Sequence, residues 1–527
     1  MLSLCISKPD TEGNIPSEIQ RIIADFEDLF EAPMGLPPKR YCDHRIPLIE
    51  GSPPINVRPY RYNPAQKDEI ERQVKEMLQN GVIQHSTSAF SSPALLVRKK
   101  DGTWRMVIDY RRLNDVTIKS KYPLPVIDEL LDELHGSKYF SKLDLRSGYH
   151  QIRLVEGEEY KTAFQTHTGH YEYRVMSFGL TGAPGTFQGA MNNTLAPVLR
   201  KYALVFFDDI LVYSPDLYSH AQHLRHVLKL LREHQWKVKL SKCSFGQSSL
   251  SYLGYTISSD GVSTDPSKVQ AIVDWPRPET VKKLRGFLGL AGYYRKFVRN
   301  FGIISKPLTT LLKKDVEFNW TPAAESAFIA LKQALVTSPV LALPDFSKQF
   351  VLETDASEVG IGAVLSQEGH PIAFVSRALG KRTRGLSTYE KECLAILLAI
   401  DHWRSYLQHG AFLIYTDHRS LTHLSEQKLT TALQHKAFTK LLGMQYTLCY
   451  KKGVANSAAD ALSRRDNSGE PALALVSSCK PSWLEEVIQG YFEDLYTKQI
   501  ISELSINATA RPDFTLSDGL LRYKGRI

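Results

Sequence analysis

The chain has 527 residues, of which 43% are hydrophobic, and this length suggests about three or four folded domains. Its 65 lysines and arginines exceed its 56 acidic residues, and the resulting formal charge of +9 suits a polyanionic partner. The six cysteines form no C-x-x-C pair, and no apolar run approaches the ~20 residues of a membrane helix. These features argue against a disulfide framework, a cysteine zinc site and a membrane-spanning protein, and they favour a reducing compartment.

The first half of the chain reads as a lead-in followed by mixed helices and strands. Proline-rich stretches surround one short amphipathic helix, so a linker is expected over 1–45. From 46 to 260, helical patterns alternate with short strands, and one helix should begin near Pro64 and end before Gly81. The apolar runs ALLVRKK and WRMVIDY, separated by DGT, predict a hairpin.

One strand-like run, YALVFFDDILVYS at 202–214, carries two adjacent carboxylates, Asp208 and Asp209. It predicts a hairpin with its turn at the two aspartates, and a solvated turn is the alternative to a functional site. Asp144 ends another strand-like run upstream. Carboxylates gathered from two strands would repel each other unless divalent cations such as Mg²⁺ lay between them. Because adjacent side chains of a strand point to opposite faces, Asp208 is expected to lie nearer to Asp144 than Asp209 does.

A helical pattern follows from 261 to 345, in which Leu284, Phe287, Leu288 and Ala291 fall at i, i+3, i+4 and i+7 and form one apolar stripe. Residues 281–314 contain nine lysines or arginines and no acid. A solvated helical face is the usual interpretation of such a run, but its position after the carboxylate motifs favours a surface that contacts phosphates. The residues expected to make these contacts are Lys282, Lys283, Arg285, Arg295, Lys296 and Arg299.

A further α/β unit is expected over 346–465. Three consecutive strands lead into the apolar helix KECLAILLAIDHWRSYL, and AFLIYTD returns to strand. A linker and a mostly helical tail are expected over 466–527. Four acids stand at strand ends or on helices of this unit, namely Asp355, Glu392, Asp417 and Asp460, and Glu390 is the rival of Glu392.

Three motifs in chain order, LDLRSGYHQI, MSFGLTGAPGTFQ and FFDDILVY, resemble the motif set of reverse transcriptases. From about 44 to 465 the sequence resembles gypsy-class long-terminal-repeat retrotransposon polyproteins. The resemblance implies an α/β and α+β multidomain protein, a right-hand polymerase followed by a ribonuclease H-like α/β domain. Fingers and palm would occupy 46–260, a thumb-like region 261–345 and ribonuclease H 346–465.

The resemblance also assigns residues to nucleotide binding. Lys99 and Arg105 would hold the triphosphate of the incoming nucleotide, although exposed basic residues beside a hairpin are the alternative. Tyr149 would stand against the ribose 2′-hydroxyl, with a core tyrosine as the alternative. Phe178 and Gly179 would pack under the templating base pair.

Other roles follow from the same resemblance. Leu253, Gly254 and Tyr255 in SYLGYTI resemble the primer grip, a pattern that is also common in ordinary strands. Lys242 resembles a lysine that protonates pyrophosphate. The catalytic and metal-binding acids of the polymerase would be Asp144, Asp208 and Asp209.

The chain departs from the family pattern at a few positions. Ser177 stands where proline is usual, and Gly182 and Gly185 stand where asparagine and alanine are frequent. Glycine loosens a helix by about 1 kcal/mol relative to alanine. These departures leave the expected metal site intact.

The four acids of the last unit resemble the carboxylate centre of ribonuclease H. They occur within TDAS, YEKE, YTDH and AADALSR. Glu392 is preferred to Glu390 because it precedes Ala395 by three residues, which matches the family's Glu-x-x-Ala spacing. No histidine follows His435, so the mobile loop histidine of some relatives is not expected.

The function implied is an RNA- and DNA-directed DNA polymerase with ribonuclease H activity, using Mg²⁺, or Mn²⁺ in its place, with two ions at each active site. Its partners would be an RNA template, a DNA or tRNA-like primer, RNA–DNA hybrids and dNTPs, with no membrane, and a homodimer is left open. It is expected in the cytoplasm within retroelement particles, with nuclear entry left open.

Two other interpretations are weighed against this one. A decayed or domesticated relic would bind nucleic acid without catalysis, and a repair-type polymerase would leave the ribonuclease H carboxylates without a task. No D-[ST]-G triplet of an aspartic protease occurs. The tail over 466–527 resembles the start of an integrase zinc module without its ligands, so the chain is expected to be a truncated piece of a larger polyprotein.

Overall fold

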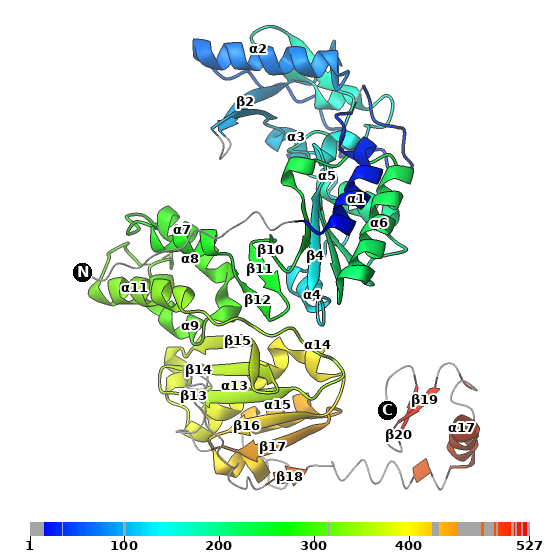
Figure 1. Ribbon diagram of the computed structural model, residues 1–527. Coiled ribbons are helices and arrows are strands. Elements are labelled where there is room, and N and C mark those ends of the chain that lie inside the picture. The colour runs from blue at the N-terminus through cyan, green and yellow to red at the C-terminus, as the bar shows by residue number, and fades with distance from the viewer. Residues whose placement is uncertain are drawn as a thin grey trace. The chain divides into compact units, whose positions relative to one another are not determined.

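The computed structural model describes residues 15–33, 35–98, 102–314, 316–423, 432–451, 476–478, 490–491, 494–506, 511, 514–517 and 520–523. The chain divides into two compact units, Met1–Asp265 and Pro266–Ile527, and each is described by itself (Figure 1). Two of the predicted site residues, Lys99 and Asp460, lie outside the described residues. No described helix is long and apolar enough to cross a membrane.

The first unit contains helices whose ends follow local sequence signals. The Asn63 side chain accepts a hydrogen bond from the backbone N–H of Gln66 at 2.9 Å, Pro64 opens the helix, and Gly81 follows its end with a φ of +67°. The helices are α1 (Ser17–Asp25), α2 (Pro64–Gln79), α3 (Arg111–Asp115), α4 (Ile127–Asp132), α5 (Ala183–Thr194) and α6 (Leu217–Glu233). Short 3-10 helices are η1 (Glu27–Phe30), η2 (Gly148–Gln151), η3 (Glu159–Thr162) and η4 (Leu240–Lys242).

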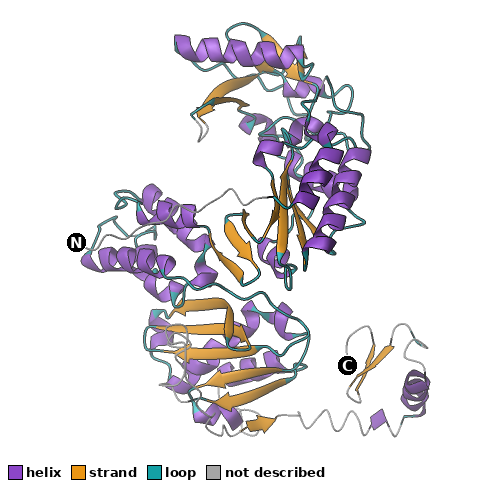
Figure 2. Cartoon of the chain, viewed as in Figure 1, coloured by secondary structure: helices purple, strands orange, loops and turns teal. Residues whose placement is uncertain are grey.

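The strands of the first unit form three sheets (Figure 2). The first has the order β1-β6-β5-β2-β3, from β1 (Ile83–His85), β6 (His170–Tyr173), β5 (Phe164–Gln165), β2 (Ser92–Arg98) and β3 (Trp104–Ile108). The second has the order β7-β8-β4-β9, from β7 (Ala203–Phe206), β8 (Asp209–Ser214), β4 (Tyr139–Asp144) and β9 (Ser244–Gln247). The third joins β10 (Ser249–Tyr252), β11 (Tyr255–Ser258) and β12 (Gly261–Thr264). The boundary expected at 260 therefore falls just before a strand that belongs to this unit.

The segment expected to be a linker over 1–45 instead contributes to the core of the first unit. Ile19 and Ile22 on α1 are buried, and Leu29 and Phe30 on η1 are buried in the same cluster as the strands. The Ile-x-x-Ile spacing places both isoleucines on one helix face, and burying that face stabilises the segment against the rest of the unit.

The second unit begins with helices and continues with a mixed sheet. Its helices are α7 (Pro266–Val273), α8 (Val281–Tyr293), α9 (Phe301–Ile304), α10 (Lys306–Thr310), α11 (Pro322–Val336), α12 (Lys381–Arg384), α13 (Thr388–His402), α14 (Arg404–Leu407), α15 (Ala432–Leu441) and α17 (Leu495–Ile506), with η5 (Arg295–Phe297) and η6 (Arg419–His423). Its strands are β13 (Val351–Ala356), β14 (Gly360–Gln367), β15 (His370–Ala378), β16 (Phe412–Thr416), β17 (Tyr446–Tyr450) and β18 (Val476–Ser478), with β19 (Phe514–Ser517) and β20 (Leu520–Tyr523) as a separate pair.

The main sheet of the second unit has the order β15-β14-β13-β16-β17-β18. Strands β13, β14 and β15 pair antiparallel, whereas β13, β16 and β17 run parallel. Helix α13 packs on β13 and β14 (Figure 1). The carboxyl ends of the two parallel strands β13 and β16 therefore meet at one edge of the sheet, which is where two of the predicted acids stand.

Candidate active sites

The first centre is built from two adjacent strands. Strand β4 pairs antiparallel with β8, and this register sets Asp144 directly opposite Asp209. In the β7–β8 hairpin, Phe206 pairs with Asp209, so the two-residue turn consists of Phe207 and Asp208. The turn lies one residue earlier than the sequence suggested. The expectation that the Asp208 carboxylate is nearer than that of Asp209 to Asp144 stays a prediction, since the register pairs the backbone of Asp144 with Asp209 while the charge of Asp144 also acts on Asp208. Directly opposed residues share a face of the sheet, so Asp144 and Asp209 point the same way.

The turn itself is strained. Phe207 has a φ of +52°, in the left-handed region that favours glycine and that costs a bulky residue about 1–2 kcal/mol. Its backbone N–H donates to the side-chain oxygen of Gln188 on α5 at 2.8 Å, and the amide of Gln188 donates to the Val205 carbonyl at 3.2 Å. Gln188 is fully buried and therefore holds the strained turn in place.

The three aspartates repel each other, and two lysines offset part of that repulsion. Burial raises the pKa of Asp208, and the negative charges of Asp209 and Asp144 raise it further. Lys242 Nζ lies 3.0 Å from Asp144 Oδ2, and Lys142 Nζ lies 3.0 Å from Asp209 Oδ1. Asp208 is left as the half-buried carboxylate whose charge is least compensated.

This donor set fits a divalent cation. Within the described ranges, no three acidic, histidine or cysteine side chains converge as ligands of one ion, and the lysines hold two of the three aspartates. Carboxylate oxygens are the ligands that Mg²⁺ takes in proteins. Burial first, and the charges of Asp209 and Asp144 second, raise the pKa of Asp208, and a cation bound beside it would offset both effects.

Gly148, which the sequence interpretation did not single out, allows the chain to approach the turn. A Cβ atom at this position would lie 2.9 Å from Phe187 Cζ and 3.3 Å from Asp208 Cβ. The ring of Phe187 is fully buried and has little room to move. The glycine in RSGYHQ was the available signal, and its role becomes clear only from the packing.

Three of the residues predicted to bind the nucleotide, Arg105, Phe178 and Tyr149, form a row that leads to Asp208. The Tyr149 ring centroid lies 4.8 Å from that of Phe178 and 5.3 Å from that of Phe187. Burial raises the pKa of Tyr149, and the charge of Asp208 raises it further, so the two side chains are electrostatic neighbours. At the other end of the row, the Arg105 guanidinium lies 5.3 Å from the Phe178 ring centroid.

Gly179 occupies a position that requires glycine. Its φ is +96°, and a Cβ atom there would lie 3.3 Å from the Ile108 carbonyl oxygen. The Asn114 side chain donates to the Gly179 carbonyl at 2.8 Å and accepts from the Thr181 backbone N–H at 2.9 Å. Asn114 thus fixes the loop that carries Phe178 and Gly179.

The two glycines that depart from the family pattern lie at close contacts. A Cβ atom at Gly182 would lie 3.0 Å from His44 Cε1, and one at Gly185 would lie 3.0 Å from Ser120 Oγ. Helix α5 begins directly after Gly182 and contains Gly185, so the helix forms despite them. Their absent side chains make room for two segments from elsewhere in the unit.

The expected primer-grip residues form the β10–β11 turn. Leu253 and Gly254 have φ values of +50° and +80°, which describe a tight two-residue hairpin, and Tyr255 is buried at the start of β11. The preceding residue, Tyr252, is fully buried, and its hydroxyl has no hydrogen-bond partner among the described residues. Burial raises the pKa of Tyr252 and the charge of Asp209 raises it further, which places this hairpin beside the aspartate centre.

The second centre lies at the edge of the sheet in the second unit. Asp355 stands near the end of β13, Asp417 follows β16, and Glu392 projects from α13. Glu392 is fully buried, and burial raises its pKa to about 8, with further contributions from Asp417 and Asp355. Thr416 Oγ1 donates to Glu392 Oε2 at 3.4 Å, while Glu392 Oε1 has no partner among the described residues. This orphaned buried oxygen fits a site that holds a cation.

Glu390 has a different task from Glu392. Its carboxylate accepts hydrogen bonds from the backbone N–H and the hydroxyl of Ser387, both at 3.0 Å, and so closes the capping box of α13. The structure therefore places Glu392, and not its rival, beside Asp417 and Asp355.

Several neighbours of the second centre were missed by sequence reasoning. His418 directly follows Asp417, its ring centroid lies 5.2 Å from that of Tyr389, and its buried Nδ1 has no partner in the part of the chain that the structure describes. Lys451 Nζ lies 2.8 Å from Glu353 Oε1 on β13. A histidine after Asp417 was a visible signal, whereas nothing in the sequence linked Lys451 to Glu353.

The predicted phosphate-contacting residues occupy α8, η5 and the turn that follows. Of the predicted apolar stripe of α8, Leu284, Phe287 and Ala291 are buried, and Leu288 is half-buried. Its basic residues Lys282, Lys283 and Arg285 are exposed, as is Arg295, while Lys296 and Arg299 are half-buried. Arg299 differs from the others because it reaches Asp355, with its Nη2 3.9 Å from Asp355 Oδ2.

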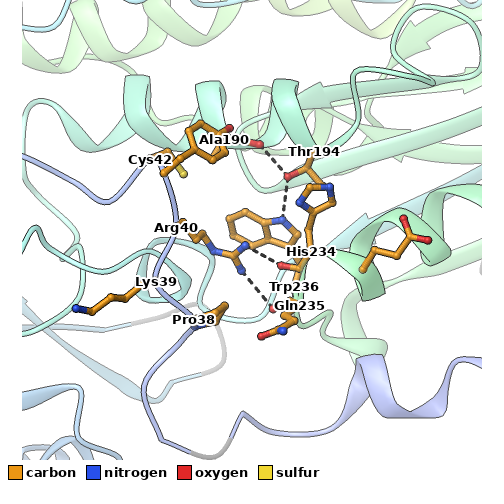
Figure 3. Close-up of a pocket in the computed structure, with 11 residues that line it drawn as sticks. Pro38, Lys39, Arg40, Cys42, Ala190, Thr194, His234, Gln235 and Trp236 are labelled. Atoms are coloured by element: carbon orange, nitrogen blue, oxygen red, sulfur yellow. Dashed lines mark hydrogen bonds between the residues drawn. The ribbon is translucent and has the colours of Figure 1, made fainter.

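A separate cavity of about 250 Å³ lies in the first unit (Figure 3). The Arg40 guanidinium lies 3.8 Å from the Trp236 ring centroid and donates to the carbonyl oxygens of His234 and Gln235 at 2.7 and 3.3 Å. The Trp236 indole N–H donates to Thr194 Oγ1 at 3.0 Å. None of the candidate site residues lines this cavity. The hydrogen bonds of Arg40 and its contact with Trp236 anchor the segment around Arg40.

Comparisons with known proteins match a part of the chain that contains Asp144, Asp208 and Asp209, and another that contains Asp355 and Glu392 and ends before Asp417. A family model for reverse transcriptase (RNA-dependent DNA polymerase) matches residues 97–257, and a model for the RNase H-like domain found in reverse transcriptase matches residues 320–414.

Curated relatives are transposon polyproteins. The retrovirus-related Pol polyprotein from transposon 297 of Drosophila melanogaster is 44% identical over 418 residues, covering 78% of this chain and 39% of that protein. The corresponding polyprotein from transposon opus of the same species is 38% identical over 483 residues, covering 88% and 48%. The Tf2-3 polyprotein of Schizosaccharomyces pombe is 35% identical over 477 residues, covering 88% and 35%. The chain thus spans less than half the length of these relatives.

Solved structures share the fold. The foamy viral protease-reverse transcriptase dRH in complex with double-stranded DNA has a TM-score of 0.76 at 23% identity, covering 86% of this chain and 83% of that chain. The same viral enzyme in complex with an RNA/DNA hybrid has a TM-score of 0.70 at 22% identity, covering 90% and 67%. These likenesses confirm the predicted fold class.

Proposed function

Because this chain belongs to the reverse transcriptase and ribonuclease H region of gypsy-type retrotransposon Pol polyproteins, we propose that it copies RNA and DNA templates into DNA and cleaves RNA paired with DNA. One observation carries this proposal. Two separate carboxylate clusters exist, and each contains an acid whose pKa is raised by burial and by its acidic neighbours, namely Asp208 and Glu392. Buried carboxylates that repel one another are typical of sites that bind metal ions and act on phosphates.

We assign divalent cations to both clusters, Mg²⁺ or Mn²⁺ in its place, with two ions at each. The acids that would hold them are Asp144, Asp208 and Asp209 in the first cluster, and Asp355, Glu392, Asp417 and Asp460 in the second. Such ions, when bound, would activate the attacking hydroxyl or water and neutralise the charge of the leaving oxygen.

The other residues of the first cluster would orient the nucleotide. Arg105 presents a planar fork of donors that suits the triphosphate. Tyr149, held between Phe178 and Phe187, would form a wall beside the sugar and exclude the ribose 2′-hydroxyl by steric contact. Lys242 forms an ion pair with Asp144 in this structure. When Asp144 binds a cation instead, the ammonium of Lys242 would face solvent or contact the pyrophosphate.

In the second cluster, Glu392 carries a proton at neutral pH as long as no cation is present. Its pKa of about 8 means that the neutral form predominates at pH 7. Loss of that proton from the buried carboxyl would accompany cation binding, so binding should be tighter at higher pH.

The partners proposed for this chain are an RNA template, a DNA or tRNA-like primer, RNA–DNA hybrids and dNTPs. Two solved relatives were captured with double-stranded DNA and with an RNA/DNA hybrid, which supports nucleic acid as the ligand class. We further propose residence in the cytoplasm within retroelement particles, with nuclear entry, and self-association as a homodimer. Family membership is what supports these assignments.

The test is dNTP incorporation on an RNA template with a DNA primer, measured with and without Mg²⁺, together with cleavage of a labelled RNA–DNA hybrid. The proposal expects both activities, and both should require the metal. A protein that binds the hybrid tightly yet shows neither activity would instead be a relic that only binds nucleic acid.

A further inference from the structure

The segment over 299–306, which precedes the ribonuclease H-like sheet, is hydrogen-bonded to it. The Gly302 backbone N–H on α9 donates to Ser376 Oγ on β15 at 2.8 Å. Lys306 Nζ on α10 donates to the Leu379 carbonyl, just past β15, at 2.6 Å. Both elements belong to the same compact unit, so these bonds hold the segment against one edge of the sheet.

Glycines on both sides of this contact make the fit close. A Cβ atom at Gly302 would lie 2.5 Å from the Ser376 carbonyl oxygen, and one at Gly360 on β14 would lie 2.4 Å from Ile303 Cγ1. A Cβ atom at Gly362 would lie 3.2 Å from Asn300 Oδ1. Side chains at these positions would force the segment away from the sheet. The close packing therefore fixes the residues around Asn300 against the sheet.

This docking brings one arginine to the second carboxylate centre. Arg299 and Asp355 line the same small hollow, and Arg299 Nη2 lies 3.9 Å from Asp355 Oδ2. The Arg299 side chain is 33% exposed and that of Asp355 is 51% exposed. A distance of 3.9 Å is too long for a hydrogen bond, and an ion pair this exposed contributes little to stability.

The guanidinium of Arg299 is therefore held near the centre with a long, weak ion pair to Asp355. Among the residues that the structure describes, the guanidinium makes no other ion pair and donates no hydrogen bond. Its N–H donors remain available to a ligand that arrives beside Asp355. A backbone phosphate is the group that fits, because two of its oxygens match the planar guanidinium fork.

We propose that Arg299 binds a backbone phosphate of the RNA strand beside the scissile bond, and so completes the ribonuclease H centre from the segment before it. The inference rests on the proposed ribonuclease H function and deepens it. It also separates Arg299 from the rest of the basic run, whose members on α8 face solvent. Arg299 lies before residues 320–414, the part that matches the RNase H-like family model, so the site extends beyond that match.

The experiment compares four full-length proteins: wild type, Arg299→Ala, Arg299→Lys and the control Arg404→Ala, which removes an exposed arginine on α14 of the same unit. Each is assayed on one RNA–DNA hybrid and on hybrids in which a single RNA phosphate is replaced by an uncharged methylphosphonate. Arg299→Ala should lower kcat/KM for hybrid cleavage by about tenfold or more, the usual effect of losing a hydrogen bond to a charged group. Arg299→Lys should recover part of this loss, and Arg404→Ala and DNA synthesis should change less than about twofold.

The methylphosphonate series identifies the phosphate. At one position near the cut, the uncharged substitution should weaken cleavage by the wild type about tenfold and should add nothing to the loss in Arg299→Ala, because the two changes remove the same contact. Equal effects in both proteins at every position would overturn the inference. So would faster cleavage by Arg299→Ala, which would make the arginine an inhibitory counter-ion of Asp355.

A binding measurement separates this inference from the proposed function. Fluorescence anisotropy with the same hybrids, in an Asp417→Asn background, reports the contact without cleavage. The same single position should show non-additive losses of affinity. If the wild type fails to cleave the hybrid, the proposed function is wrong, whereas a position-independent response to Arg299→Ala in the binding series refutes the arginine contact itself.

Discussion

Replacing Glu392 with glutamine should change how the stability of the second unit depends on pH. Glutamine has the shape of the protonated carboxyl and cannot ionise. The wild-type carboxyl has a folded-state pKa of about 8 against an ordinary value of 4.5, so the folded protein binds the proton more tightly than the unfolded chain does. By linkage, the stability that this group contributes is present below about pH 4.5 and is lost as the pH rises toward 8.

The magnitude follows from the two pKa values. A difference of 8 minus 4.5 is roughly 3.5 pH units, and each unit corresponds to about 1.4 kcal/mol. Between pH 5 and pH 8, the wild type should therefore lose up to about 4 kcal/mol of unfolding free energy that the Glu392→Gln protein keeps. Titrating groups that do not interact with Glu392 are common to both proteins and cancel in the difference, whereas the coupled Asp417 and Asp355 do not cancel fully.

The assay is urea unfolding of wild type and Glu392→Gln at pH 5, 6, 7 and 8 in a buffer with EDTA. The two proteins should be similar at pH 5, and Glu392→Gln should be the more stable at pH 8. Parallel stability curves across this range, or a less stable Glu392→Gln protein at pH 8, would refute the interpretation that the buried carboxyl is neutral when no cation is present.

Three further changes probe the first unit and the basic run. In single-nucleotide extension, Tyr149→Ala should raise rNTP incorporation relative to dNTP incorporation by roughly tenfold, about 1.4 kcal/mol of lost discrimination, whereas Tyr149→Phe should change little. If rNTP incorporation by Tyr149→Ala equals that of the wild type, Tyr149 is a core residue. Neutralising Lys282 and Arg285 together, both exposed on α8, should reduce the salt slope of duplex binding by about one to two units for every sequence, and an unchanged slope would favour a solvated face. Gly148→Ala should lower dNTP incorporation about tenfold and destabilise the first unit by roughly 1–3 kcal/mol, because the added methyl group would overlap Phe187. The control Gly289→Ala, which has open space at its Cβ, should be harmless, and equal behaviour of the two variants would discount the close contact at Gly148.

Local signals in the sequence predicted several elements because their causes are local. The Asn63 cap, Pro64 and Gly81 delimit α2 through hydrogen bonds and backbone geometry within a few residues. The spacing of Leu284, Phe287 and Ala291 likewise identified the buried face of α8. The motif resemblance identified the family and the fold, which the comparisons confirm.

Features set by packing between distant segments could not be predicted in the same way. The β7–β8 turn forms one residue early because Gln188, from another helix, holds the N–H of the strained Phe207, so Asp209 pairs with Asp144. The approach of Arg299 to Asp355 depends on glycines in strands that lie more than 50 positions later in the chain, such as Gly360. No pattern within either segment encodes such a contact.

We propose that two independent carboxylate centres catalyse two different reactions on nucleic acid. The most direct measurement compares dNTP incorporation on an RNA template and cleavage of an RNA–DNA hybrid for wild type, Asp208→Asn and Asp417→Asn, with thermal unfolding as a check on folding. Asp208→Asn should lose most DNA synthesis and keep hybrid cleavage, and Asp417→Asn should show the reverse, because the two carboxylates belong to different compact units. Loss of both activities in either well-folded variant, or loss of neither, would contradict the account.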